Sequence, residues 1–110
     1  MNQNLAEAGN SGSPLVSVYI PTHNRPDRLV RAIASCQAQD HRNLEILVSD
    51  DGSGPATEEL VRALMERDPR IRFFRSPNAK GACHARNIAI SHANGEFITG
   101  LDDDDEFLPN

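Results

Sequence analysis

The sequence predicts an α/β fold with a mostly parallel sheet and helices on its faces, and three observations lead to this prediction. Short apolar, β-branched runs alternate along the chain with segments in which apolar residues recur at helical spacing. Clusters of Gly, Pro, Asn and Asp separate many of these runs. The segments between runs can hold helices of about a dozen residues, which right-handed crossovers between parallel strands require.

The first strand is expected over residues 15–20, where LVSVYI is apolar and rich in β-branched residues. Pro21 breaks that run. A helix is then expected to begin near Pro26, because proline suits the first helical turn and Asn24 can cap the helix. The second strand, LEILVS at residues 44–49, ends in an Asp-Asp-Gly-Ser turn.

The second helix is expected to pack Leu60, Ala63 and Leu64 against the sheet, and the Asp-Pro dipeptide after it ends the helix. The third strand is the short run IRFF at residues 71–74. A third helix is expected over residues 82–93, with the following Asn-Gly pair as its C-terminal signal.

The fourth strand is expected over residues 96–101, and its apolar composition predicts that it is buried. In parallel sheets, ligands bind beyond the carboxyl ends of the strands. The candidate site is therefore formed by four loops, at residues 21–26, 50–55, 76–81 and 102–109.

The charge of the chain is concentrated in one place. The 110 residues, enough for one small domain, carry 16 acidic and 11 basic side chains and a formal net charge of −5. The acidic run at residues 102–106 accounts for the whole excess, and no basic patch indicates a nucleic acid partner. Two cysteines without C-x-x-C spacing favour a reducing compartment over a disulfide framework or a zinc site. No apolar run reaches the roughly 18 residues of a membrane span.

The neighbouring carboxylates of the acidic run repel one another, and a bound cation would relieve this repulsion. Two carboxylates about 4 Å apart repel by roughly 1 kcal/mol in water and by more near a protein surface, and a divalent cation reverses the sign of that cost. In extended geometry Asp102 and Asp104 point to one side, and Asp103 and Asp105 to the other. Oxygen ligands of this kind suit Mg²⁺ or Mn²⁺. The alternative is a solvated acidic segment without a ligand.

Two other loops carry candidate binding groups. The Asp-Asp-Gly-Ser turn at residues 50–53 can accept hydrogen bonds from a nucleobase or a ribose, or can be a plain turn and helix cap. Arg86 lies near the start of the third helix, where anions are favoured, or is an ordinary surface arginine. Cys83 is expected to be a small buried side chain rather than a reactive thiol.

These segments together resemble the family 2 glycosyltransferases. The resemblance runs in order over about residues 15–110. It rests on VSVYIPTHNR at 16–25, VSDDGS at 48–53, G-x4-RN-x-A at 81–89, GEFI at 95–98 and LDDDD at 101–105. It implies the GT-A fold, transfer of a sugar from a nucleotide-sugar with inversion, and a divalent cation, Mn²⁺ or Mg²⁺, on the diphosphate.

The resemblance also implies roles for individual residues. The expected nucleotide-sugar-binding residues are Pro21, Thr22, Asn24, Asp51, Arg86, Asp102 and Asp103. Asp51 would accept a hydrogen bond from the base, and Arg86 would approach the base or the diphosphate. Asp104 and Asp102 are the expected metal ligands. His23 departs from the pattern, because many members of the family carry tyrosine there, and the unbroken aspartate run leaves the register of the ligands open.

The resemblance further implies a domain organisation. Residues 15–110 are expected to be the nucleotide-sugar-binding half of a GT-A domain, truncated after the D-x-D motif, whereas the Asn, Gly and Ser content of residues 1–14 predicts a flexible tail. The catalytic base is expected beyond Asn110, so the isolated chain is expected to be inactive. A UDP-sugar is the expected donor, and the acceptor could be a polysaccharide, a lipid-linked glycan or a protein glycan. The expected location is the cytoplasm or the inner face of a membrane, and association through an exposed sheet edge is an open option.

Three alternatives remain open at this stage. A sugar-phosphate nucleotidyltransferase usually carries a glycine-rich loop after its first strand, whereas residues 21–26 contain no glycine. A receiver-like phosphoryl-transfer domain needs a lysine near a fifth strand, whereas the single lysine is Lys80. A non-catalytic nucleotide-binding or assembly module is the third.

Overall fold

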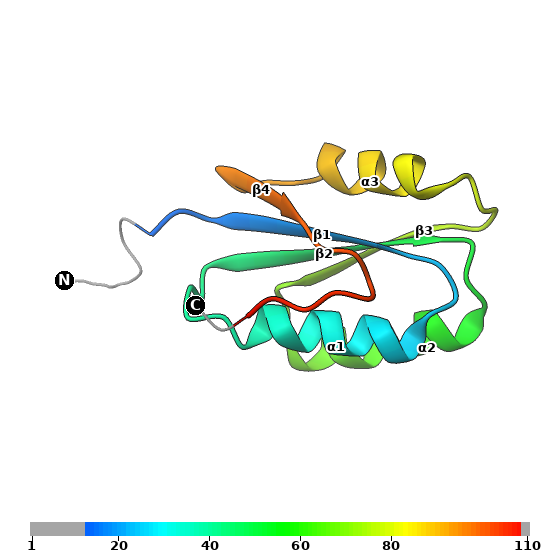
Figure 1. Ribbon diagram of the computed structural model, residues 1–110, viewed down its shortest axis with the longest axis horizontal. Helices are drawn as coiled ribbons and strands as arrows, with labels where there is room; N and C mark the ends of the chain where they lie inside the picture. Colours follow the sequence, from blue (N-terminus) through cyan, green and yellow to red (C-terminus); the bar gives the residue numbers. More distant parts are fainter. Residues whose placement is uncertain (1–12, 109–110) are drawn as a thin grey trace.

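Four parallel strands form one sheet in the order β3-β2-β1-β4 in the computed structural model, which describes residues 13–108 (Figure 1). The strands are β1 (Val16–Thr22), β2 (Leu44–Asp51), β3 (Ile71–Ser76) and β4 (Phe97–Gly100). The helices are α1 (Pro26–Gln37), α2 (Pro55–Arg67) and α3 (Ala82–Ser91). The predicted α/β class with a parallel sheet and flanking helices is confirmed.

The strand order reverses once, at β1. The chain moves outward from β1 to β2 and β3, and then crosses back to place β4 on the other side of β1. Helices α1 and α2 cover one face of the sheet, and α3 covers the other (Figure 1). The reversal creates a crevice beyond the carboxyl ends of β1 and β4, which is where sheets of this kind bind ligands.

Strand alternation builds two different layers. One face contributes to a cluster under α1 and α2, made of Val18, Ile20, Leu29, Ala32, Ile33, Cys36, Leu44, Ile46, Val48, Val61, Ile71 and Leu101. Burial raises the pKa of the Cys36 thiol to about 12, so this cysteine is a packing residue. On the other face, the buried residues of α3 are Ala85 and Ala89, whose small side chains let the helix lie close to the sheet.

Three strands extend two residues further than the sequence predicts. β1 continues to Thr22, β2 to Asp51 and β3 to Ser76, although these ends contain turn-forming residues. The parallel register explains the difference, because it pairs Thr22 with Asp50, and Asp51 with Ser76. Pairing with neighbouring strands outweighs the local turn preference. The polar residues that were predicted to lie in loops therefore start from rigid strand ends.

The prediction that the fourth strand is buried is wrong for β4, although Leu101, the last residue of the predicted strand, is buried in the core cluster. All four residues of β4 are exposed, with Phe97 at 60% and Ile98 at 46%. The reason is topological, because β4 is an edge strand that pairs with β1 alone within residues 13–108. An apolar run cannot reveal whether a strand has one neighbour or two. The expected association through this edge stays a prediction.

The expected inner face of the second helix is also partly wrong. Ala63 is exposed, whereas Thr57 and Val61 are buried and Leu64 packs against the core cluster. The helix is thus rotated relative to the prediction, with Thr57 and Val61 on its buried side.

The tail predicted for residues 1–14 lies outside the described part of the chain, apart from Ser13 and Pro14. The carbonyl oxygens of these two residues accept hydrogen bonds from Asn43 Nδ2 and His41 Nε2, at 2.9 and 2.8 Å. Among the described helices, none has the length and apolar character needed to cross a bilayer.

A buried carboxylate ties the sheet together at the end remote from the crevice. Glu45 Oε2 accepts hydrogen bonds from Ser17 Oγ and the Asn94 backbone, both at 2.6 Å, and Oε1 accepts one from Arg72 at 3.0 Å. Burial alone would raise the pKa of Glu45, but these bonds from Ser17, Asn94 and Arg72 hold it below its ordinary value. One side chain on β2 thus joins β1, β3 and the turn that leads into β4.

Glu45→Gln is expected to lower the free energy of unfolding by about 1–3 kcal/mol, because the amide replaces an acceptor with a donor beside three donors. The pKa of Glu45 is lower in the folded chain, so its stabilisation is present above the ordinary value of 4.5 and is lost as pH falls through the folded value. Denaturant unfolding between neutral and acid pH measures both effects. The exposed Glu59 supplies the control, Glu59→Gln, which should change little. Equal stability of the two variants across that range would refute the role given to Glu45.

Candidate functional site

A pocket of about 300 Å³ lies beyond the carboxyl ends of β1, β2 and β4, at the strand-order reversal. It is lined by Pro21, Thr22, His23, Arg25, Asp51, Ala82, Ala85, Asp102, Asp103 and Asp104. Its position agrees with the rule that ligands bind in the crevice at a switch point. Polar groups from three strand ends therefore converge on one space beside the start of α3.

The pocket brings together many of the residues singled out from the sequence. These are Pro21, Thr22, Asp51, Asp102, Asp103 and Asp104. Asn24 and Arg86 do not line it. Sequence reasoning missed Arg25, although its place after the end of the first strand was a usable signal. It also missed Ala82 and Ala85, which line the pocket. Their small side chains leave room there but have no functional group that would mark them in the sequence.

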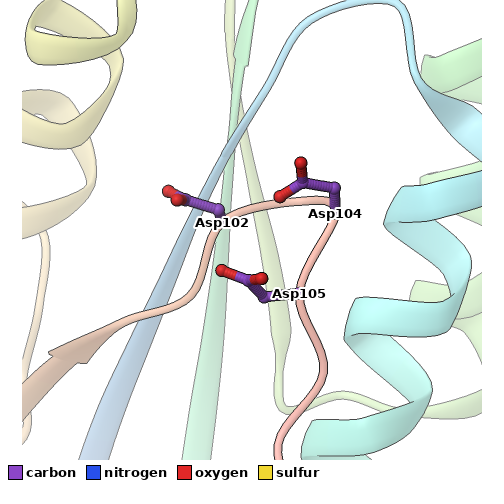
Figure 2. Close-up of side chains that lie close together, drawn as sticks. All are labelled: Asp102, Asp104 and Asp105. Atoms are coloured by element: carbon purple, nitrogen blue, oxygen red, sulfur yellow. The ribbon is translucent and has the colours of Figure 1, made fainter.

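The acidic segment after β4 is a tight turn and not an extended chain. The Asp105 backbone N–H donates to the Asp102 carbonyl at 3.0 Å, which closes the turn. The side chains of Asp102, Asp104 and Asp105 lie close together at this turn (Figure 2), whereas Asp103 is buried. The expectation that Asp103 and Asp105 share one side is wrong, because the turn rotates Asp105 away from the alternation of a strand.

Asp103 anchors the acidic turn to the sheet. It is 6% exposed, and its Oδ2 accepts a hydrogen bond from Thr22 Oγ1 at 2.9 Å. Its Oδ1 lies 3.4 Å from the guanidinium of Arg25. Its two oxygens therefore face Thr22 at the end of β1 and Arg25 at the start of α1, which fixes the turn over the crevice.

The other three carboxylates have the chemistry of a site for a hard cation. Asp102, Asp104 and Asp105 are exposed, and each offers one oxygen within 4.8 Å of the other two. A donor set of oxygens alone, open to water, fits Mg²⁺ or Mn²⁺, which keep several waters and use few carboxylates. The pair predicted from the sequence belongs to this group, and Asp105 joins it through the turn.

Two arginines of the first loop and helix lie beside this group. Asp104 Oδ2 is 3.7 Å from Arg25 and 3.8 Å from Arg28. All three side chains are largely exposed, so each ion pair contributes less than about 1 kcal/mol. The arginines reduce the negative potential of the turn without neutralising it.

Asp51 connects the end of β2 to the segment before α3. Its Oδ1 accepts from the Lys80 N–H at 2.7 Å and its Oδ2 from the Gly81 N–H at 2.9 Å. Each carboxylate oxygen can accept a further bond, so a ligand in the pocket could still use Asp51. Gly52 has φ +75°, and a Cβ there would lie 2.7 Å from Ala79 N. A side chain at position 52 would therefore push this segment away.

Asp50 points to the opposite face and does not line the pocket. Its Oδ1 accepts from the Ser53 N–H at 3.1 Å, which closes the turn after β2. Its Oδ2 has no hydrogen-bond partner within residues 13–108, and Arg75 Nε lies 3.7 Å away. Asp50 stabilises the turn after β2 through its bond to Ser53, whereas Asp51 faces the pocket.

Asn24 does not cap α1 as the sequence predicts. The N-cap is Arg25, without a side-chain cap, and Asn24 has φ +52°. Its backbone N–H donates to Ser53 Oγ at 2.7 Å and its Oδ1 accepts from the Gly54 N–H at 3.0 Å. Bonds to a second loop have displaced the local capping interaction.

The start of α3 also differs from expectation. Cys83 is exposed and not buried, because it lies on the outer side of the helix. Arg86 donates to Cys83 Sγ at 3.2 Å. The predicted contact of Arg86 with a base or diphosphate stays a prediction.

Solved structures share this fold. A mannosyltransferase from Pyrobaculum calidifontis, solved in complex with GDP-Man and Mn²⁺, superposes with a TM-score of 0.79 and 29% identity, over 88% of this chain and 29% of that one. S. aureus TarS 1-349, solved in complex with UDP, gives a TM-score of 0.75 and 28% identity, over 83% of this chain and 28% of that one. The sheet and its helices form the core of the GT-A fold, as the resemblance implied.

Relatives of known sequence agree with this assignment. The putative colanic acid biosynthesis glycosyl transferase WcaA of Escherichia coli (strain K12) is 46% identical over 100 residues, which cover 89% of this chain and 35% of that protein. A GalNAc(5)-diNAcBac-PP-undecaprenol β-1,3-glucosyltransferase of Campylobacter jejuni is 47% identical over 96 residues, which cover 86% and 31%. The chain thus spans about a third of the length of these relatives. Residues 17–110 match the profile of glycosyl transferase family 2, and the chain belongs to that family.

Proposed function

We propose that this chain binds the nucleotide-sugar donor of an inverting, cation-dependent glycosyltransferase. The observation that carries the proposal is the pocket at the strand-order reversal, where Asp51 and the acidic turn line one space. The similar structures that contain GDP-Man with Mn²⁺, and UDP, support a nucleotide-sugar as the ligand. A UDP-sugar is the donor that we propose.

The nucleoside and the diphosphate of the donor would lie in different parts of the pocket. The nucleoside would lie by Asp51 and the small side chains of Ala82 and Ala85, which leave room beside α3. Asp51 would accept a hydrogen bond from the base, and Thr22 would stay bonded to Asp103 in the wall. The diphosphate would lie by the acidic turn, with Arg25 as a positive group in the lining.

The cation would be held by Asp102 and Asp104, with Asp105 as a third candidate ligand. Bound there, Mn²⁺ or Mg²⁺ would supply positive charge that stabilises the nucleoside diphosphate as a leaving group. The chain's own contribution is to fix the turn through Asp103 and to keep the three exposed carboxylates close together.

We further propose that the general base and the acceptor site lie in the part of the relatives that this chain does not cover. The names of two relatives refer to colanic acid biosynthesis and to an undecaprenol-linked glycan, which favours a polysaccharide or lipid-linked acceptor. A lipid-linked acceptor would place the enzyme at the cytoplasmic face of a membrane.

The 110-residue chain should bind the donor but not transfer sugar. Incubation of the purified chain with UDP-sugars, Mn²⁺ and simple glycan acceptors, followed by mass spectrometry, measures transfer. No product is expected, because no base would be placed against the acceptor hydroxyl. Multiple turnovers in this assay would contradict the proposed division between donor binding and catalysis.

Mn²⁺ should strengthen binding of UDP to the chain by at least about tenfold, and Asp104→Asn should remove most of that gain. Calorimetry with UDP, GDP, dTDP and CDP, with and without Mn²⁺, measures the gain and the base preference. Glu106→Gln is the matched control, because Glu106 follows the turn but does not belong to the three-carboxylate group. Equal affinities with and without the cation would count against the proposed site.

Asp103→Ala should lower the free energy of unfolding by about 1–3 kcal/mol, because it leaves the Thr22 hydroxyl without its buried partner. Asp102→Ala should leave stability nearly unchanged, because Asp102 is exposed. Denaturant unfolding of the two variants without added metal makes the comparison. The opposite order of stabilities would show that Asp103 is not the anchor of the turn.

A further inference from the structure

Asn24 joins the loop that carries His23 to the loop that follows Asp51 at the end of β2. Its backbone N–H donates to Ser53 Oγ at 2.7 Å, and its Oδ1 accepts from the Gly54 N–H at 3.0 Å. The side chain itself does not line the pocket. We propose that Asn24 is a positioning residue, which fixes the His23 ring and the loop after β2 so that the pocket is formed before the nucleotide binds.

The backbone of Asn24 explains how neighbouring residues reach the pocket. Its φ of +52° lies in the left-handed region, which asparagine adopts more readily than most residues. The residues on both sides of it, His23 and Arg25, line the pocket, whereas Asn24 is turned toward the second loop. A residue that disfavours positive φ would disturb both neighbours at once.

The His23 ring is held in one tautomer by two contacts. His23 Nδ1 lies within hydrogen-bond distance of the Asp51 carbonyl oxygen, which can only accept, so Nδ1 carries the proton. In the neutral ring Nε2 is then an acceptor, and Asn24 Nδ2 lies 3.4 Å from it. The amide orientation of Asn24 agrees with Nε2 as an acceptor. Its Oδ1 accepts from the Gly54 N–H, so its Nδ2, which is a donor, faces the ring.

The consequence for ligand binding is pre-organisation. His23 and Asp51 both line the pocket, and Asn24 connects the loop that carries His23 to the loop that follows Asp51. Without the Asn24 side chain, the ring and the loop would have to be ordered when the ligand binds, and that ordering weakens affinity. This inference rests on the proposed function, because the ligand is taken to be a nucleoside diphosphate.

The main test compares Asn24→Gly with the wild-type chain. Glycine tolerates the positive φ but lacks the bonds to Gly54 and His23. We expect binding of UDP with Mn²⁺ to weaken by about five- to tenfold, measured by calorimetry at a temperature where both proteins are folded. Ser53→Ala, which removes the acceptor of the Asn24 N–H, should weaken binding in the same direction. Asn87→Ala, at an exposed position on α3, is the matched control and should not.

A second measurement determines the tautomer of the His23 ring. Long-range ¹H–¹⁵N spectra of the imidazoles at mildly alkaline pH report which ring nitrogen carries the proton, and His23→Gln identifies the signals. The wild-type chain should show His23 with its proton on Nδ1. Asn24→Gly should show a mixture of tautomers. A purely structural role of Asn24 would change the unfolding temperature but not this pattern.

The outcomes separate the two proposals. Unchanged UDP affinity in Asn24→Gly would overturn the positioning role. If the wild-type chain binds none of the nucleoside diphosphates, the proposed function fails, and the spectra still decide whether Asn24 positions His23. An unchanged His23 pattern in Asn24→Gly would then overturn the inference, and a changed pattern would support it.

Discussion

The hydrogen bond between Thr22 and Asp103 determines how the acidic turn meets the sheet. It joins residues that are 81 positions apart, and it is buried, so its loss would leave unpaired polar groups away from water. Because Asp103 is directed inward, the turn presents Asp102, Asp104 and Asp105 to the outside. The end of β1 therefore sets the orientation of side chains that the sequence places after β4.

Adjacent aspartates divide structural and ligand-facing roles at two places. At the end of β2, Asp50 is buried behind the following turn and Asp51 faces the pocket, because successive residues of a strand point to opposite faces. After β4, Asp103 is buried and Asp102 is exposed. In both places one buried carboxylate, Asp50 or Asp103, fixes the turn beside a carboxylate that lines the pocket, Asp51 or Asp102. A pair of acidic residues at a strand end can therefore be explained without ligand contact by both, because one of them stabilises the turn.

Periodicity and strand-end position predicted the sheet, its helices and most of the pocket. The loops after β2 and β4 could be singled out because polar residues at the carboxyl ends of parallel strands meet at one edge, and the resemblance to family 2 glycosyltransferases then implied Asp51 and Asp104 within them. The conformation of residues 102–105 could not be predicted, because the turn depends on a bond to Thr22 that is far away in sequence. The role of Asn24 was missed for the same reason, since its partners Ser53 and Gly54 belong to another loop.

The charges around the pocket explain why a cation fits the proposed function. A nucleoside diphosphate is an anion, and an acidic turn would repel it. Arg25 and Arg28 lie near Asp104, but exposed ion pairs of this kind contribute less than about 1 kcal/mol each and are screened by salt. Asp102 and Asp105 have no ion pair to an arginine or lysine within residues 13–108. A divalent cation between the turn and the diphosphate would convert repulsion on both sides into attraction, which two exposed arginines do not achieve.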